Sequence, residues 1–374
     1  MILGIDAINI ESGGGKRHLN ELLNYQIKNK PFNKIIIWSS LKTLTTFQDS
    51  PYIEKRSHKF LNRGYFFRIL WQIFISKHEF TKSIDILFSP SGTYIGKFHP
   101  YISMSQNMLI FQKNEQKNFK LSFYRLKFYI LNIIQKKSFK NSNGIIFISD
   151  YAYHYISNLF SILNKKIVVI NHGINFNFFI KPKKQFEIDH YNLNNPFKLL
   201  YVSPFYNYKH QLEVIEAFLN LRKVGYNITL DLVGNFMQKS QERKIHNFLK
   251  YNNLDSSIFI HKEVKLNEIQ KFYHNTNAFI FASSCENMPN ILIEAMASGL
   301  PIACSNLKPM TDFLGGNAFY FNPYQPNSIF LAIENMLNNH NLRNEYSYNV
   351  YNIAKQYTWD QCAYETYKFL LNTK

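Results

Sequence analysis

Apolar residues along this chain fall into short runs, separated by longer stretches in which every third or fourth residue is apolar. In the first half, the runs lie at residues 2–5, 34–38, 84–88, 101–104, 144–149 and 166–171. Short apolar runs predict buried strands of a parallel sheet, and the helix-length segments between them predict helices that cover it. The first half is therefore expected to form a doubly wound α/β domain.

The same alternation restarts after a polar stretch at residues 181–196. Its apolar runs lie at residues 198–203, 228–233, 257–260, 278–282 and 300–304. With 374 residues, the chain is long enough for two domains that each bury a core. We predict two Rossmann-like domains, over residues 1–176 and 177–355, and a further helix in residues 356–374.

Residues 281–301, FASSCENMPNILIEAMASGLP, carry two glutamates, Glu286 and Glu294. The strand expected before them and Pro289, which suits a first helical turn, place Glu286 in a strand-to-helix loop. Glu294 falls one turn inside the following helix, which Gly299 ends. Ligands bind at this edge of an α/β sheet, and carboxylates there accept hydrogen bonds from sugar or ribose hydroxyls. The alternative is a solvated helix glutamate beside a loop glutamate.

A glycine-rich loop follows the first expected strand. Gly13, Gly14 and Gly15 precede a helix expected over residues 16–28, and glycine lets backbone N–H groups approach a phosphate closely. The spacing fits neither a Walker loop nor a G-x-G-x-x-G fingerprint, so a plain tight turn is an equal alternative.

Lys209 lies at the start of a helix expected over residues 211–222. A cation at a helix N-terminus opposes the helix dipole. A diphosphate bound between the lysine and the helix would remove this conflict.

Composition narrows the class of protein. Hydrophobic residues make up 46% of the chain, which excludes general disorder. Cys285, Cys304 and Cys362 are scattered, so neither a disulfide framework nor a zinc site is predicted. The N-terminal residues lack a basic leader, and no apolar run is long enough to span a bilayer. We therefore expect a cytoplasmic protein.

The net charge of +18 is concentrated in the first half. Residues 1–180 contain 24 Lys and Arg against 9 Asp and Glu, a difference of 24 − 9 = +15. This excess favours an anionic partner: a membrane surface, a phosphorylated substrate or nucleic acid. Segments 59–77 and 120–140 mix bases with bulky apolar residues. They fit helices lying on an anionic bilayer, or helices packed on the sheet with snorkelling lysines.

The region of Glu286 and Glu294 resembles the E-x7-E region of the family 4 glycosyltransferases, and Lys209 matches a lysine that these enzymes carry at the start of the corresponding helix. Three departures stand beside the likeness. Residues 203–208 lack the arginine that usually precedes the lysine, Asn235 replaces a second glycine after Gly234, and Gln106 and Asn107 stand where many relatives have a histidine.

The resemblance implies a GT-B fold, with two Rossmann-like domains facing across a cleft and a C-terminal helix that returns to the first domain. It implies transfer of a sugar, with retention of configuration and without a metal or other cofactor, from a nucleotide-diphosphate donor to a saccharide or lipid-linked saccharide acceptor. Assembly of surface polysaccharide or O-antigen is the expected role. The chain contains no D-x-D sequence, in line with this expectation.

The resemblance also assigns residues to parts of the reaction. Glu286 and Lys209 are the expected catalytic residues. The donor is expected on Ser203, Gly234, Glu294 and the backbone of Asn290, Ile291 and Leu292, and the acceptor side on Gly14, Gly15, Gln106 and Asn107.

Other interpretations keep the same fold. One is a non-catalytic basic protein that binds a membrane surface or an anion, and another is a nucleotide-sugar epimerase. Nucleic acid is not expected as a partner, because no recognised binding module occurs and the two glutamates would repel phosphate. The basic first half and the lipid-linked acceptor together predict peripheral attachment to the inner face of the cytoplasmic membrane.

Overall fold

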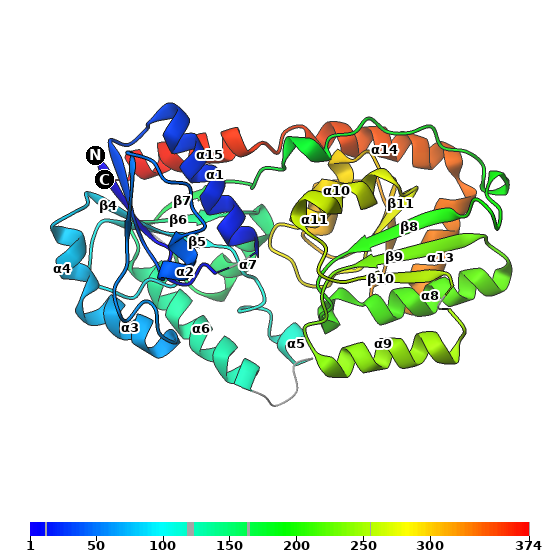
Figure 1. Ribbon diagram of the computed structural model, residues 1–374, viewed down its shortest axis with the longest axis horizontal. Helices are drawn as coiled ribbons and strands as arrows, with labels where there is room; N and C mark the ends of the chain where they lie inside the picture. Colours follow the sequence, from blue (N-terminus) through cyan, green and yellow to red (C-terminus); the bar gives the residue numbers. More distant parts are fainter. Residues whose placement is uncertain (12, 118–122, 163–164, 255, 374) are drawn as a thin grey trace. The chain divides into compact units, whose positions relative to one another are not determined.

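The computed structural model describes residues 1–11, 13–117, 123–162, 165–254 and 256–373 (Figure 1). The chain forms two compact units. The first unit comprises Met1–Gly173 and Tyr357–Lys374, and the second comprises Ile174–Gln356.

The first unit is built on a seven-stranded parallel sheet with the strand order β3-β2-β1-β4-β5-β6-β7. Its strands are β1 Ile2–Asp6, β2 Lys34–Trp38, β3 Ile53–Arg56, β4 Ile86–Ser89, β5 Tyr101–Ser105, β6 Gly144–Phe147 and β7 Lys166–Val169. Its helices are α1 Gly13–Asn29, α2 Leu41–Leu44, α3 Tyr65–Phe74, α4 Ser76–Thr81, α5 Lys113–Gln116, α6 Phe123–Asn141, α7 Asp150–Leu159 and α15 Trp359–Leu371. Helices cover both faces of the sheet, with α1 and α15 on one face and α3 and α6 on the other (Figure 1).

Helix α15 completes the first unit by packing against α1 (Figure 1). The buried Tyr367 hydroxyl donates a hydrogen bond of 2.7 Å to the carbonyl of Leu22 in α1. Gly173 lies directly against the backbone of Trp359, since a Cβ at this glycine would be 2.1 Å from the Trp359 nitrogen. The prediction that the C-terminal helix returns to the first domain is confirmed.

The second unit contains a six-stranded parallel sheet with the order β10-β9-β8-β11-β12-β13. Its strands are β8 Phe197–Val202, β9 Ile228–Val233, β10 Ile258–His261, β11 Ala278–Phe281, β12 Ile302–Ser305 and β13 Phe319–Phe321. Its helices are α8 Gln211–Val224, α9 Lys239–Tyr251, α10 Leu266–His274, α11 Asn290–Ala297, α12 Met310–Leu314, α13 Pro326–Asn338 and α14 His340–Ala354, with 3-10 turns η1 Phe176–Phe178, η2 Ile188–His190 and η3 Asn207–Lys209.

The predicted parallel α/β architecture is confirmed, and each apolar run of the sequence contains a strand. Two strands at sheet edges, β3 and β13, were not predicted. The glycine-rich loop prediction was wrong, because Gly13, Gly14 and Gly15 form the first turn of α1. The helix begins at Gly13. This residue adopts a left-handed φ of 69°, a conformation that glycine tolerates.

The two basic, apolar segments are helical where they are described. Gly64 is the N-cap of α3 in the first segment, and a second short helix, α4, follows. The second segment becomes α6 from Phe123 onward, and residues 120–122 lie outside the described part of the chain. Within the described ranges, none of the helices combines the length and apolar character that crossing a membrane requires.

Candidate functional site

The predicted donor-site and catalytic residues lie in segments that follow strands β8, β9 and β11 of the second sheet, four of them in helix α11. Strands β9, β8 and β11 are neighbours and run parallel, so the segments that follow them meet at their carboxyl ends. Gly234 follows β9, Lys209 follows β8 in η3, and Glu286 follows β11 in the loop before α11. Parallel strand order thus gathers residues that are far apart in the sequence at the edge where α/β sheets bind ligands.

Lys209 and Glu286 form an ion pair between the Lys209 Nζ and Glu286 Oε1 atoms. Their side chains are only 7% and 15% exposed, so both charges are largely removed from solvent. The ammonium also lies 5.3 Å from the ring centroid of Tyr208 and 5.4 Å from that of Phe281. In this structure the Glu286 carboxylate supplies a negative charge beside Lys209, and the binding of a diphosphate between Lys209 and the helix stays a prediction.

Glu294 lies inside α11 with its side chain buried. The hydroxyl of Tyr273, on α10, donates to its Oε2 atom at 3.3 Å. A solvated helix glutamate, the alternative left open by the sequence, does not describe this residue. Its carboxylate is held in the second unit on the helix that starts just after the Glu286 loop.

Ser203 and Gly234 come together at the ends of β8 and β9. A Cβ at Gly234, whose φ is 152°, would lie 2.0 Å from the carbonyl oxygen of Ser203, so only glycine fits this close approach. The Ser203 hydroxyl accepts a hydrogen bond of 2.9 Å from the side-chain amide of Gln211, the first residue of α8. Gln211 is buried and was not predicted as a site residue.

The start of α11 contains the backbone N–H groups that were expected to face a phosphate. The Asn290 N–H donates to the Met288 carbonyl at 3.0 Å, and the Leu292 N–H to the Pro289 carbonyl at 2.8 Å. Among the described residues, the Ile291 N–H makes no such backbone hydrogen bond outside the helix. Ile291 is thus the best placed of the three to offer an N–H group to a ligand.

Two further residues surround the ion pair and were missed by the sequence reasoning. Burial and the charge of Glu286 raise the pKa of the Tyr208 hydroxyl well above its usual range. His210 adopts a left-handed φ of 51° at the start of α8, and its Nε2 atom lies 3.0 Å from the hydroxyl of Ser284. From the sequence, residues 206–208 lie in the segment that lacks the arginine usual in the family. No sequence pattern predicted that His210 adopts a left-handed backbone conformation.

The first unit contains a separate pocket of about 700 Å³ that is lined by three of the predicted acceptor-side residues, Gly15, Gln106 and Asn107. A Cβ at Gly15 would lie 3.0 Å from the Gln106 side-chain oxygen, so this glycine leaves room for the amide. Gly14 is not part of the pocket lining and lies exposed in the first turn of α1.

The lining of this pocket includes both charged and apolar side chains. Arg68 of α3 forms an ion pair of 2.6 Å with Glu11 and donates to the Ile8 carbonyl at 3.0 Å. Leu126 and Ile130 of α6 also line the pocket and are exposed. The pocket therefore suits a ligand with both hydroxyl groups and apolar surface.

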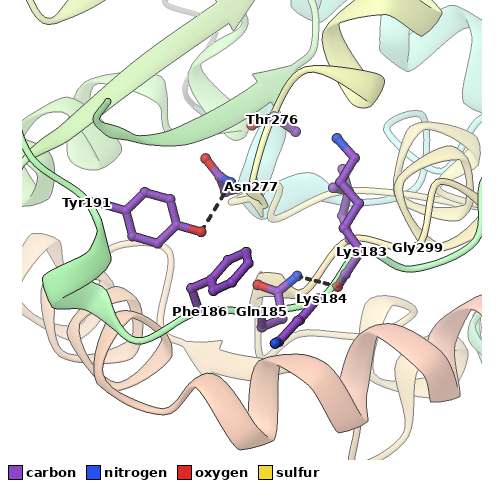
Figure 2. Close-up of a pocket in the computed structure, with 9 residues that line it drawn as sticks. Lys183, Lys184, Gln185, Phe186, Tyr191, Thr276, Asn277 and Gly299 are labelled. Atoms are coloured by element: carbon purple, nitrogen blue, oxygen red, sulfur yellow. Dashed lines mark hydrogen bonds between the residues drawn. The ribbon is translucent and has the colours of Figure 1, made fainter. Parts of the chain in front are cut away.

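A smaller cavity of about 230 Å³ lies at the amino ends of the strands in the second unit (Figure 2). Figure 2 shows Asn277 directed at the Tyr191 hydroxyl, to which its amide donates at 3.4 Å. The Gln185 amide donates to the Lys183 carbonyl at 3.1 Å. These polar groups are bonded within the protein, and the cavity contains none of the predicted site residues.

The two Rossmann-like units and the lysine and carboxylates at the carboxyl ends of the second sheet define an α/β protein of the two-domain type, and part of the second unit matches a known family. Residues 183–353 match the family described as "Glycosyl transferases group 1". The predicted resemblance to glycosyltransferases is thereby confirmed, and this segment is a group 1 glycosyltransferase domain.

Two proteins with similar sequences are named as glycosyltransferases of capsular polysaccharide and O-antigen. CapM of Staphylococcus aureus, a capsular polysaccharide biosynthesis glycosyltransferase, is 26% identical over 255 residues, which is 66% of each protein. RfbU of Salmonella typhimurium, an O-antigen chain mannosyltransferase, is 27% identical over 206 residues, 54% of this chain and 53% of RfbU. The matched part of this chain thus spans between about half and two thirds of these relatives.

Solved structures match over the full length. Sucrose-phosphate synthase from Thermosynechococcus elongatus superposes with a TM-score of 0.73 at 15% identity and covers 100% of both chains. Anabaena HepE, in complex with UDP-glucose, gives 0.74 at 13% identity, again over 100% of both chains. At these identities the likeness shows the fold alone, and the predicted GT-B class is confirmed.

Proposed function

We propose that this chain is a retaining, metal-independent glycosyltransferase that moves a sugar from a nucleotide-diphosphate donor to a saccharide or lipid-linked saccharide, in surface polysaccharide or O-antigen assembly. One observation carries the proposal. Lys209 and Glu294 are buried and Glu286 is 15% exposed, all three lie within the segment that matches the glycosyltransferase family, and Lys209 and Glu286 lie at the carboxyl ends of its sheet. The names of the relatives support the polysaccharide role.

The donor end of the reaction is assigned to the second unit. The Lys209 ammonium stabilises the leaving diphosphate, with help from the N-terminus of α11. The Glu294 carboxylate accepts hydrogen bonds from the ribose hydroxyls, and Glu286 contacts the donor sugar. Because HepE is known in complex with UDP-glucose, uridine donors are the first to test.

The acceptor end is assigned to the pocket of the first unit. The amides of Gln106 and Asn107 can orient a sugar hydroxyl, but neither takes up a proton at neutral pH. The proton of the attacking hydroxyl is therefore assigned to the leaving phosphate. The pocket volume of about 700 Å³ accommodates a saccharide group.

An anionic membrane surface is the proposed second partner. Helix α6 exposes four apolar side chains at helical spacing, Leu126, Tyr129, Ile130 and Ile133, which we call the α6 stripe. Its sequence contains lysines and an arginine but no acidic residue, and Leu126 and Ile130 also line the acceptor pocket. Apolar groups flanked by bases fit a bilayer with acidic lipids, and they support a peripheral location at the inner membrane face.

Loss of the two charges of the donor site tests the proposal. Lys209→Ala and Glu294→Ala should each lower transfer by at least about a hundredfold, because transition-state charge stabilisation and donor positioning are lost. The measurement is acceptor-dependent release of nucleoside diphosphate from a panel of nucleotide sugars. Such release also separates a transferase from an epimerase and from a non-catalytic binding protein.

Matched controls come from exposed residues of the same unit. Lys223→Ala, in α8, and Glu345→Ala, in α14, remove the same charges at exposed positions and should leave transfer unchanged. Circular dichroism checks that all four variants fold. Full activity of both Lys209→Ala and Glu294→Ala would contradict the glycosyltransferase proposal.

A further inference from the structure

We infer that donor binding exchanges the partner of Lys209: the donor diphosphate displaces the Glu286 carboxylate from the ammonium, and Glu286 is released to contact the donor sugar. This inference rests on the proposed function, since it concerns how the proposed donor enters its site. The proposed function gives Lys209 and Glu286 separate roles, and the inference adds the separation of the two side chains when the donor binds.

The ion pair shows why an exchange is required. Lys209 and Glu286 carry opposite charges and are both largely buried, so together they present no net charge to a ligand. A diphosphate is strongly anionic, and it gains little from a lysine whose charge a carboxylate already offsets. Tight binding therefore requires that Lys209 leave Glu286.

The groups around Glu286 do not offer its carboxylate a second cation, so the carboxylate is expected to move when Lys209 leaves it. Its negative charge, after burial, contributes to the raised pKa values of the Tyr201 and Tyr208 hydroxyls and the Cys304 thiol. These three groups remain protonated and supply no positive charge. When the phosphates take Lys209, the carboxylate is left beside weak acids, and sugar hydroxyls are the partners that suit it.

The backbone around the pair is held in place, which confines the exchange to side chains. The Tyr201 hydroxyl donates to the Lys209 carbonyl at 2.5 Å. The Ser284 N–H donates to the Tyr208 carbonyl at 2.9 Å, and the Ser284 hydroxyl lies 3.0 Å from the His210 ring. These bonds join the loop after β8 to the loop after β11, so rotation of two long side chains achieves the exchange.

The decisive experiment compares the binding of inorganic pyrophosphate and UDP to the wild type and to Glu286→Gln by calorimetry at low salt. Glutamine keeps the shape of the side chain but not its charge, so Lys209 is available before the ligand arrives. The variant should bind both ligands about tenfold more tightly, because the wild type reaches its competent state only by separating the pair. Its transfer rate should fall, because Glu286 no longer contacts the sugar as a carboxylate.

Glu213→Gln is the matched control. Glu213 lies in the first turn of α8, and the substitution removes the same negative charge without touching the pair. Its affinity should stay within about twofold of the wild type. Equal tightening in Glu213→Gln and Glu286→Gln, or no tightening in Glu286→Gln, would overturn the inference.

Two further readouts keep the test independent of folding defects and of the proposed function. UDP should raise the melting temperature of Glu286→Gln more than that of the wild type, even though the unliganded variant is less stable. Calorimetry in two buffers of different ionisation enthalpy should show no proton uptake by the wild type. Uptake of about one proton per diphosphate would mean that Glu286 is protonated in place and would overturn the exchange.

The failure of the exchange and the failure of the proposed function are distinguishable. Wild-type transfer without tighter binding by Glu286→Gln would contradict the exchange alone, whereas absence of transfer with every donor would contradict the proposed function.

Discussion

Asp6, at the end of β1, is a fully buried carboxyl group. Burial raises its pKa from 3.8 to about 7, although hydrogen bonds from the Ile8 N–H at 3.3 Å and the Gln72 amide at 2.8 Å act in the opposite direction. The native state therefore holds a proton that the unfolded state releases between these two pH values. Its contribution to stability is complete below about pH 4 and is lost as the pH rises to about 7.

Asp6→Asn should remove this pH dependence, because an amide has the shape of the protonated carboxyl group and does not ionise. The unfolding free energy of the first unit in the variant, relative to the wild type, should rise by roughly 4 kcal/mol between pH 4 and pH 8. Urea unfolding at a series of pH values measures it. A constant difference across this range would contradict the prediction. The comparison also cancels the opposite effect of the buried His18 and His172, whose lowered pKa values favour the native state at higher pH.

Single residues also show how far the sequence could predict the site. Lys209, Glu286 and Glu294 were identified from their positions beside expected strands and helices and from family likeness. Their contacts were not, because the Lys209–Glu286 pair joins residues 77 positions apart and depends on the order β9-β8-β11. The left-handed backbone of His210 was equally unpredictable, since its neighbours in the fold impose it.

At the level of elements, apolar runs located the strands that are buried on both faces. They located the edge strands β7 and β10 but missed the other two edge strands, β3 and β13. Strand β3, with the sequence IEKR, satisfies its charges locally, as in the 2.6 Å pair between Lys34 and Glu54. Strand β13 has only three residues, Phe319–Phe321, too few to show a period.

Gly173→Ala tests the junction between the end of the first sheet and α15. The new Cβ would lie 2.1 Å from the Trp359 nitrogen, and since backbone atoms cannot yield cheaply, α15 must shift. We expect the first unit to lose about 3 kcal/mol of unfolding free energy, measured by urea unfolding. Gly64→Ala is the matched control, because a Cβ there meets nothing within 4 Å. Equal stability of the two variants would show that α15 is not held at this point.

At the level of the whole molecule, the sequence predicted two parallel-sheet units and a basic first half. It did not predict the α6 stripe, because the bases in residues 120–140 left no clean polar face in the sequence pattern. The structure separates the two kinds of apolar residue: Phe128 and Ile134 are buried, whereas Tyr129 and Ile133 are exposed. Packing decides which positions of a helix face the sheet, and the composition of the segment does not predict them.

Flotation with liposomes tests the proposed membrane partner. The protein should float with vesicles that contain acidic phospholipid and not with neutral ones, and salt at about 0.5 M should weaken the binding, because lysine attraction is screened. A double variant, Tyr129→Gln with Ile133→Gln, should bind less without loss of transfer to a soluble acceptor, since neither residue lines the acceptor pocket. Indifference of the wild type to acidic vesicles at low salt would contradict this partner.

The position of α15 has a consequence for synthesis. The ribosome makes this helix after all of residues 174–356, although it belongs to the first unit. Until it emerges, the surface of α1 that receives Tyr367 at Leu22 is uncovered, so the second unit can fold while the first is still incomplete. The first unit therefore cannot complete its packing until the second unit has been synthesised.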